Sequence, residues 1–425
     1  MFSVWDLFTD PLFRGPTLGC MLVSLVASLV GVLVFVRRRA LLGEALSHGT
    51  YPGLIGGVLL AAALGEGWLN GAVLTGSFLS ALAALWLIDR MEKRLRVRQD
   101  VALCFVLAGS FGVGLTLVSQ VQFAYPALYR QAQGYLFGQA PTMTDLHIGL
   151  YGLLAAAVVV VILLFYKEFQ ACSFDEKFAE SLGINTRLVQ GITLLLIVTA
   201  VVTGIRSLGV VLMSAMLIAP ATAARQYTQR MHLMLLLAGF FGSLSGLLGS
   251  YLSLLFALPT GPAIVLVASA ISLFALLFSP RRGLLLRGYR ILSFRFTCAQ
   301  ENVLKGIWRS VGEGKISRRE VARLFGGGPI SAFLMLWRLE RHGWIENGKL
   351  TRDGQHRALR IIRLHRLWEV YLVSYLGVGV ERVHRNAEEM EHIITPELEK
   401  ELVDLLNDPT EDPHSQPIPP KAVTR

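Results

Sequence analysis

The chain has 425 residues, of which 53% are hydrophobic, and its formal net charge is +10 at pH 7. This length allows two or three domains, and so apolar a composition excludes an ordinary soluble globular protein. The four cysteines are scattered without a C-x-x-C pair, which excludes a disulfide framework and a cysteine zinc cluster.

The first 280 residues consist mostly of apolar runs separated by short polar links. Nine of these runs approach the ~20 residues that span a hydrocarbon core, which predicts an all-α polytopic membrane domain over residues 1–282 with about nine transmembrane helices. Basic clusters alternate with links poor in basic residues, so the positive-inside rule places the N-terminus outside and the C-terminus in the cytoplasm of a bacterial inner membrane. The runs lie near residues 18–36, 41–64, 70–88, 100–120, 146–166, 189–204, 207–224, 231–257 and 261–279.

Glu44 and His48 lie four residues apart within the second apolar run. Ionisable groups inside a membrane are energetically expensive and usually line a substrate path. A carboxylate and a neutral imidazole are suitable ligands for a transient divalent-metal site. The alternative is an ion pair at the membrane surface, close to the basic run Arg37–Arg39.

This motif, together with Phe174–Gly183 and Ser207–Ala223, resembles the ABC permeases that import manganese, zinc or iron. The resemblance covers residues 10–282, although those permeases usually carry Asp where this chain has Glu44. It implies that Phe174, Asp175 and Gly183 belong to the segment that couples to an ATPase subunit. It also implies a second permease subunit, identical or paralogous, and an extracytoplasmic metal-binding protein. The chain has no Walker A pattern, so we expect ATP to bind to a separate subunit.

After residue 282 the sequence changes to the pattern of soluble domains. Residues 281–366 carry 19 basic and 6 acidic side chains, whereas residues 367–425 carry 5 and 12. We expect a basic linker at 283–298, a DNA-binding domain at 299–357, and a metal-binding and dimerisation domain with an acidic tail at 358–425. The predicted elements of the DNA-binding domain are helices over 303–308, 316–325 and 329–341 and short strands around an Asn-Gly turn at 347–348, the order of a winged helix.

In helix-turn-helix domains the second helix lies in the major groove, and basic side chains contact phosphates. Ser331 is the best candidate for a side chain that faces the bases. The expected phosphate contacts are Arg318, Arg319, Arg323, Lys349 and Arg352. The alternative is a small helical domain that serves only protein contacts.

Potential metal ligands recur at helical spacing near the C-terminus. His365 and Glu369 lie on one helix face, and a second helix presents His384, Glu388, Glu391 and His392. Imidazoles and carboxylates without thiolates favour Mn, Fe(II), Zn or Ni. A solvated helix with ordinary Glu–His pairs is the alternative interpretation.

Residues 299–420 resemble the diphtheria-toxin-repressor family of metal-dependent transcription factors, through these residues and the trailing Pro413–Pro419 segment. In that family, metal bound at two sites orders a dimer that recognises operator DNA. The resemblance implies one site formed by His365, Glu369 and His384. The other site would contain Glu388, Glu391 and His392, with Asn302 at the position of a ligand from the first helix. The carboxylate at Glu388 resembles the manganese-type branch, so we expect Mn²⁺ or Fe²⁺, with Zn²⁺ as the third candidate.

The combined prediction is a metal-import permease whose cytoplasmic extension represses metal-uptake genes, an arrangement similar to the chlamydial permease–repressor fusion. A tethered repressor reaches little DNA, so we also expect proteolytic release within residues 281–298. One alternative is a metal-sensing domain that gates the permease and never binds DNA. Another is a membrane-tethered transcription factor whose permease half is inactive.

Overall fold

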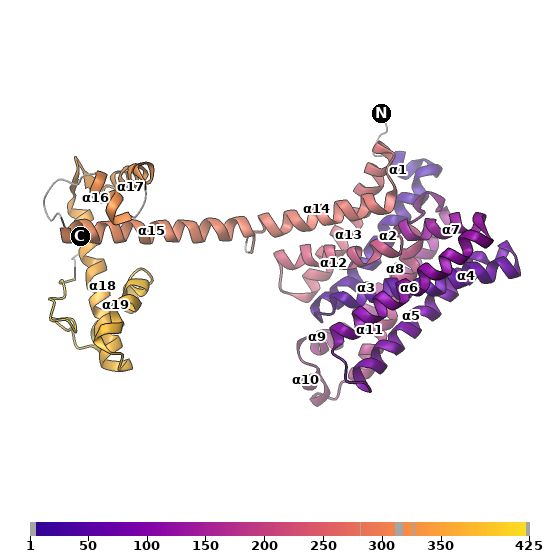
Figure 1. The fold of residues 1–425 in the computed structure, drawn as a ribbon, viewed down its shortest axis with the longest axis horizontal. Coiled ribbons are helices and arrows are strands. Elements are labelled where there is room, and N and C mark those ends of the chain that lie inside the picture. Colours follow the sequence, from indigo (N-terminus) through magenta and orange to yellow (C-terminus); the bar gives the residue numbers. More distant parts are fainter. Residues whose placement is uncertain (1–5, 281, 311–317, 326–327, 422–425) are drawn as a thin grey trace. The chain divides into compact units, whose positions relative to one another are not determined.

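The computed structural model describes residues 6–280, 282–310, 318–325 and 328–421, and it is helical almost throughout (Figure 1). The chain divides into two compact units, Met1–Leu286 and Arg287–Arg425. The predicted helix start at Ile316 and the glycines at 326–327 lie outside the described residues.

The first unit is an all-α membrane bundle. Within the described part of the chain, seven helices are long and apolar enough to cross a membrane: α2 (Pro11–Val36), α5 (Leu69–Lys93), α6 (Gln99–Ala124), α8 (Asp145–Leu164), α11 (Thr186–Leu208), α13 (Met231–Phe256) and α14 (Thr260–Phe278). The shorter helices are α1 (Asp6–Thr9), α3 (Ala40–Gly49), α4 (Tyr51–Leu64), α7 (Pro126–Phe137), α9 (Tyr166–Phe174), α10 (Glu176–Ser181) and α12 (Val210–Tyr227), with 3-10 turns η1 (Glu66–Trp68) and η2 (Ala140–Thr142).

Two of the nine predicted spans are therefore not single long apolar helices. The run at 41–64 is broken at Thr50 into α3 and α4, and Pro52 lies in the first turn of α4. Proline is tolerated there because the first turn of a helix needs no backbone donor, whereas it would interrupt a continuous helix. The run at 207–224 forms α12, which has only 18 residues and contains Pro220.

Helix α2 lies at the centre of the membrane unit, where it contacts α8, α11, α12 and α13 (Figure 1). Glycines permit these contacts. A Cβ atom on Gly242 of α13 would lie 2.7 Å from the Ser24 carbonyl oxygen, and one on Gly246 would lie 2.8 Å from Met21 Cα. Small residues at such positions let membrane helices approach closely. By contrast, most side chains of α8 face outward, as expected for a helix against lipid.

The second unit begins within α15 (Leu284–Ser310), whose first half contains the residues predicted as a basic linker. It continues with α16 (Arg318–Phe325), α17 (Pro329–Arg341), β1 (Ile345–Glu346), β2 (Lys349–Leu350), α18 (Arg352–Leu376), α19 (Val380–Met390) and α20 (Pro396–Leu405). The two strands are antiparallel, with Ile345 opposite Leu350. The intervening Asn347 and Gly348 both have positive φ, which two-residue hairpin turns require.

Two small apolar cores support this unit. One joins α15 to α16, α17 and the hairpin through Val303, Leu304, Ile307, Val321, Met335, Leu339 and Ile345. The other joins α18 to the segment after α19 and to α20 through Leu364, Ile394 and Leu402. Polar side chains from α15, α18 and α19 meet outside both cores, and these side chains form the candidate metal centre.

Candidate metal centre

Three predicted ligands converge between α18 and α19. Glu369 Oε1 lies 3.2 Å from His365 Nε2 and 3.0 Å from His384 Nδ1. The two imidazole nitrogens are 3.0 Å apart. Within the described residues, these are the only three or more His, Cys, Asp or Glu side chains whose ligand atoms gather closely enough for one ion. Ligand atoms about 2 Å from a common metal lie roughly 3–4 Å apart, so the trio fits a divalent cation.

The trio is buried on one side and open on the other. His365 and Glu369 are each 1% exposed, whereas the His384 side chain is 53% exposed. A pocket of about 340 Å³ borders all three, so an ion can reach them from solvent. Burial acts to raise the pKa of Glu369, but hydrogen bonds from His365 and His384 outweigh it, so the pKa lies below its ordinary value. Glu369 is therefore a carboxylate, the form that binds metal.

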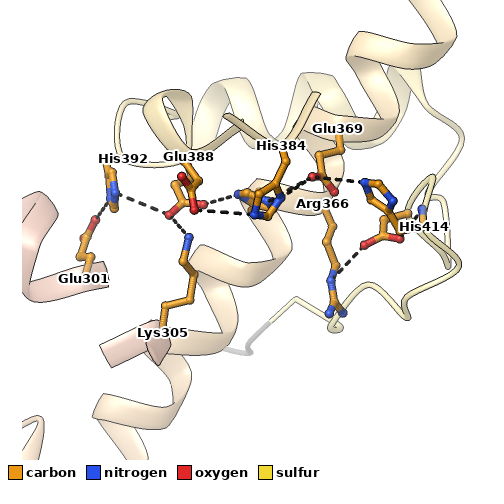
Figure 2. Close-up of polar contacts among 11 residues, drawn as sticks. Glu301, Lys305, Arg366, Glu369, His384, Glu388, His392 and His414 are labelled. Carbon is orange, nitrogen blue, oxygen red and sulfur yellow. Dashed lines mark hydrogen bonds and ion pairs between the residues drawn. The ribbon is translucent and has the colours of Figure 1, made fainter. Parts of the chain in front are cut away.

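His414, from the C-terminal tail, lies beside this trio, with Nε2 4.0 Å from Glu369 Oε1 (Figure 2). Asp412 holds the tail in place because its Oδ1 accepts hydrogen bonds from the backbone N–H groups of His414 and Gln416, each at 2.8 Å. Arg366 of α18 pairs with Asp412 at 3.3 Å. The Pro413–Pro419 segment was noted in the sequence only as a family signature, and nothing local to it predicts that His414 meets Glu369.

The second predicted ligand set forms a different kind of cluster. Glu391 pairs with the Lys305 ammonium at 2.5 Å through Oε1 and with His365 Nδ1 at 2.5 Å through Oε2. His392 Nδ1 lies 2.6 Å from Glu301 Oε2, and Arg357 binds the other oxygen of Glu301. Figure 2 shows Glu301 and Lys305 of α15 reaching this cluster, with Glu301 beside His392. Lysine and glutamate from α15 therefore take part in a cluster that the sequence pattern assigned to metal.

Two predicted members of the second set lie apart from it. Glu388 is half-exposed and lies 3.7 Å from His384 Nε2, on the side of the first trio. Asn302 is exposed, and its neighbour Glu301 makes the contact with His392 instead. Glu301, Lys305 and Arg357 were not among the predicted ligands, although Lys305 lies within the helix predicted at Val303–Trp308.

Hydrogen bonds to carboxylates also set the protonation of the second cluster. Burial acts to raise the pKa of Glu391, but the hydrogen bond from His365 and the nearby Lys305 charge hold it below its usual value. Burial likewise acts to lower the pKa of His365, and hydrogen bonds to Glu369 and Glu391 raise it overall. An ionised Glu391 can only accept, so His365 Nδ1 carries the proton between them and leaves Nε2 facing the trio.

In the membrane unit, Glu44 and His48 both lie on α3 and are half-buried. The His48 ring packs edge-on against Phe111, with centroids 4.9 Å apart. Its Nδ1 is buried without a hydrogen-bond partner. An unsatisfied buried nitrogen costs free energy, and such atoms are usually paired with protein, water or an ion. The pair is thus placed within the helix bundle, without a third close ligand among the described residues.

The predicted coupling segment forms the end of α9 and all of α10. Asp175 caps α10, since its carboxylate accepts hydrogen bonds from the N–H groups of Lys177 and Phe178 at 2.9 and 3.1 Å. Phe174 is 89% exposed, and Gly183 adopts φ +81° directly after the helix. Phe174, at the end of α9, lines a cavity of about 1250 Å³ together with Arg37–Arg39 and Arg225.

Most predicted DNA contacts lie on the surface of the second unit. Arg319, Arg323, Lys349 and Arg352 are exposed. Ser331 is half-buried in the first turn of α17, and its hydroxyl donates a 2.6 Å hydrogen bond to the Gly328 carbonyl. Arg318 begins α16, but its side chain lies outside the described part of the chain.

Each of the two units contains a region that matches a known protein family. Residues 10–279 match the model of the ABC 3 transport family. The chain belongs to the ABC 3 transport family. Residues 351–420 match a second model, the iron dependent repressor, metal binding and dimerisation domain. That match covers the trio, the His414 tail, and Arg357, Glu391 and His392 of the second cluster, but not Glu301 and Lys305.

The chain is also similar to metal transport proteins over most of its length. The chain is 36% identical to a probable metal transport system membrane protein of Chlamydia trachomatis, over 97% of both chains. It is 31% identical to the manganese transport system membrane protein MntC of Bacillus subtilis, over 89% of this chain and 88% of that one. Among solved structures, PsaBC from Streptococcus pneumoniae in complex with Fab matches 66% of this chain and 96% of that chain, with a TM-score of 0.58 and 25% identity.

As an ABC 3 family member, the chain is a multi-pass membrane subunit of a metal transporter and not itself an enzyme. The family implies an ATPase subunit and a binding protein as partners. Its C-terminal unit carries a domain type that binds divalent metal and dimerises.

Proposed function

We propose that this chain imports Mn²⁺ or Fe²⁺, with Zn²⁺ as the third candidate cargo, and that its C-terminal unit senses the imported ion. The observation that carries the proposal is the convergence of His365, Glu369 and His384 in a domain fused to a metal permease. Imidazole and carboxylate ligands without a thiolate suit these borderline and hard divalent ions. The relative from Bacillus subtilis is named as a manganese transporter.

In the transport path, Glu44 and His48 would bind the cargo briefly on its way through the bundle. The unpaired Nδ1 of His48 supports this role. The proposed topology has the N-terminus outside and the C-terminus in the cytoplasm. There, Phe174, Asp175 and Gly183 would dock the ATPase subunit. A second permease subunit and an external metal-binding protein complete the importer.

On the cytoplasmic side, residues 299–357 would act as a winged helix in a dimer. Helices α16 and α17 followed by the β1–β2 hairpin support this assignment, and so do the exposed Arg319, Arg323, Lys349 and Arg352. Metal at the trio and in residues 358–425 would order the dimer on operator DNA and repress uptake genes. Proteolytic release within 281–298 would require α15 to unwind locally, because these residues are helical from Leu284.

A gating function without DNA binding is the second candidate, favoured by the continuous helix α15 between the family-matched regions. The third candidate, a tethered transcription factor with an inactive permease, conflicts with the retained Glu44 and His48.

Footprinting separates the first two candidates. Full-length protein in nanodiscs is incubated with its own upstream DNA, with and without Mn²⁺, beside the double variant Arg319→Glu/Arg323→Glu. The repressor function predicts metal-dependent protection that the double variant loses. Unchanged DNA cleavage at every metal concentration would leave only the gating function.

A further inference from the structure

We propose that Lys305 is a built-in cation that stands in place of a second metal ion, so that the C-terminal unit binds one divalent metal per chain. This inference rests on the metal-sensing function proposed above, and it departs from the two-site arrangement that the ligand pattern predicts.

The Lys305 ammonium occupies the position from which a metal would bind Glu391. Its Nζ lies 2.5 Å from Glu391 Oε1, and the two side chains are 7% and 0% exposed. The other oxygen of Glu391 is already bound to His365 Nδ1 at 2.5 Å. Both oxygens of the carboxylate are therefore engaged, and α15 is tied to the end of α19 without any ion (Figure 2).

The charges around this pair are already balanced. The two carboxylates of the second cluster, Glu301 and Glu391, face two cations, Arg357 and Lys305, and also contact His392 and His365. A divalent ion would add two positive charges to a group whose carboxylates already have cationic partners, and it would have to displace an ammonium that then lacks a partner. Leaving a buried charge unpaired is strongly destabilising. The cluster therefore disfavours a second metal, although it contains the residue types of a metal site.

Lys305 also positions a ligand of the first site. The contacts run from Lys305 to Glu391, from Glu391 to His365 Nδ1, and from His365 Nε2 to the trio. Metal-binding histidines usually donate the other ring N–H to a carboxylate, which fixes the tautomer and the ring orientation. Lys305 is thus a positioning residue for the single metal, and it makes the link from α15 that a second ion would otherwise make.

Counting bound metal tests this inference. Every full-length protein carries His48→Ala, which removes the transport ligand, and is purified in detergent and dialysed against Mn²⁺. We expect one ion per chain with Lys305 present and two in Lys305→Glu, where a new carboxylate joins Glu391 and His392. Lys400→Gln, which removes an exposed lysine on α20, serves as the matched control and should bind one ion.

Two ions in the protein that retains Lys305 would overturn the inference and leave the metal-sensing function intact. One ion in a folded Lys305→Glu protein, checked by its thermal melt, would also overturn it. If that variant does not fold, the number of ions bound by the protein that retains Lys305 still decides between one site and two. No ion in any protein would overturn the sensing function itself, and this result differs from both of the others.

Discussion

Helices α3 and α18 each carry a histidine and a glutamate four residues apart, in opposite surroundings. On α18, His365 and Glu369 meet His384 from α19, and the tail adds His414. On α3, His48 packs against Phe111, and no third ligand converges with it and Glu44 among the described residues. The same spacing therefore produces a crowded ligand set in one unit and a sparse one in the other.

This difference matches what the two proposed sites must do. A transport site has to release its ion, so binding must be weak enough for the ion to leave. A sensor has to keep its ion long enough to change the population of a conformation, which requires preferential binding to one state. We infer that the number of converging ligands, rather than the His–Glu spacing, distinguishes a site that releases its metal ion from a site that keeps it.

The largest effect is expected from His48→Ala. With only one other ligand in the path, uptake of radioactive Mn²⁺ by the reconstituted transporter should fall to the level of vesicles that lack the chain. Metal affinity of the C-terminal unit should stay unchanged. His232→Ala, on the separate helix α13, is the control. Uptake equal to that of the parent protein would remove His48 from the path.

Glu369→Gln should have the next largest effect, because Glu369 Oε1 touches both histidines of the trio. Loss of a partner that orients metal-binding histidines costs 10–100-fold, and loss of the ligand itself should reach roughly 100-fold. Competition with a fluorescent chelator, in the His48→Ala background, measures the affinity. Glu389→Gln, exposed on α19, should match the parent protein. An unchanged affinity in Glu369→Gln would exclude the trio as the sensor site.

His414→Ala should weaken metal binding by roughly 10-fold, since the tail histidine approaches Glu369 from outside the trio. The same chelator competition measures the effect. Ser415→Ala is the neighbouring control. If both variants bind as tightly as the parent protein, the sensor uses only the three ligands on α18 and α19.

The smallest effect is expected from Glu44→Asp, which introduces the residue usual in similar permeases. The carboxylate is kept, so uptake should stay within about threefold of the parent protein, a difference of less than 1 kcal/mol. Glu44→Gln, which removes the charge at equal size, should abolish uptake in the same vesicles. Loss of uptake in Glu44→Asp would show that the reach of the longer side chain is essential.

The sequence predicted those features that depend on local pattern. The helix at Pro329–Arg341 was found because proline at the first turn and an apolar period are visible in the chain. The pairing of His365 with Glu369 follows from their helical spacing. Hydropathy could not reveal the break at Thr50, since both halves of the run are apolar. About nine spans were predicted, and the described part of the chain contains seven long apolar helices.

Features that depend on packing between distant segments were not predictable. Lys305 lies 86 positions from Glu391 in the sequence, and Glu301 lies 91 positions from His392. The face of α19 is also divided by the helices around it: Glu388 lies beside His384, while Glu391 turns toward α15. Helical periodicity groups these two residues, and only the neighbouring helices separate them.

The hydrogen bonds that hold the C-terminal tail against α18 have a practical consequence for truncated forms of this protein. The Pro417 and Pro419 carbonyl oxygens accept hydrogen bonds from Arg366 and Arg363 of α18. A chain cut before residue 412 would lose these anchors along with His414. The half-buried Arg366 would lose both Asp412 and the Pro417 carbonyl beside the trio, whereas Arg363 would keep Glu399 and Asp408. A reporter or affinity tag should therefore follow Lys421. Exopeptidase trimming of the last segment would weaken metal sensing and leave the membrane bundle untouched.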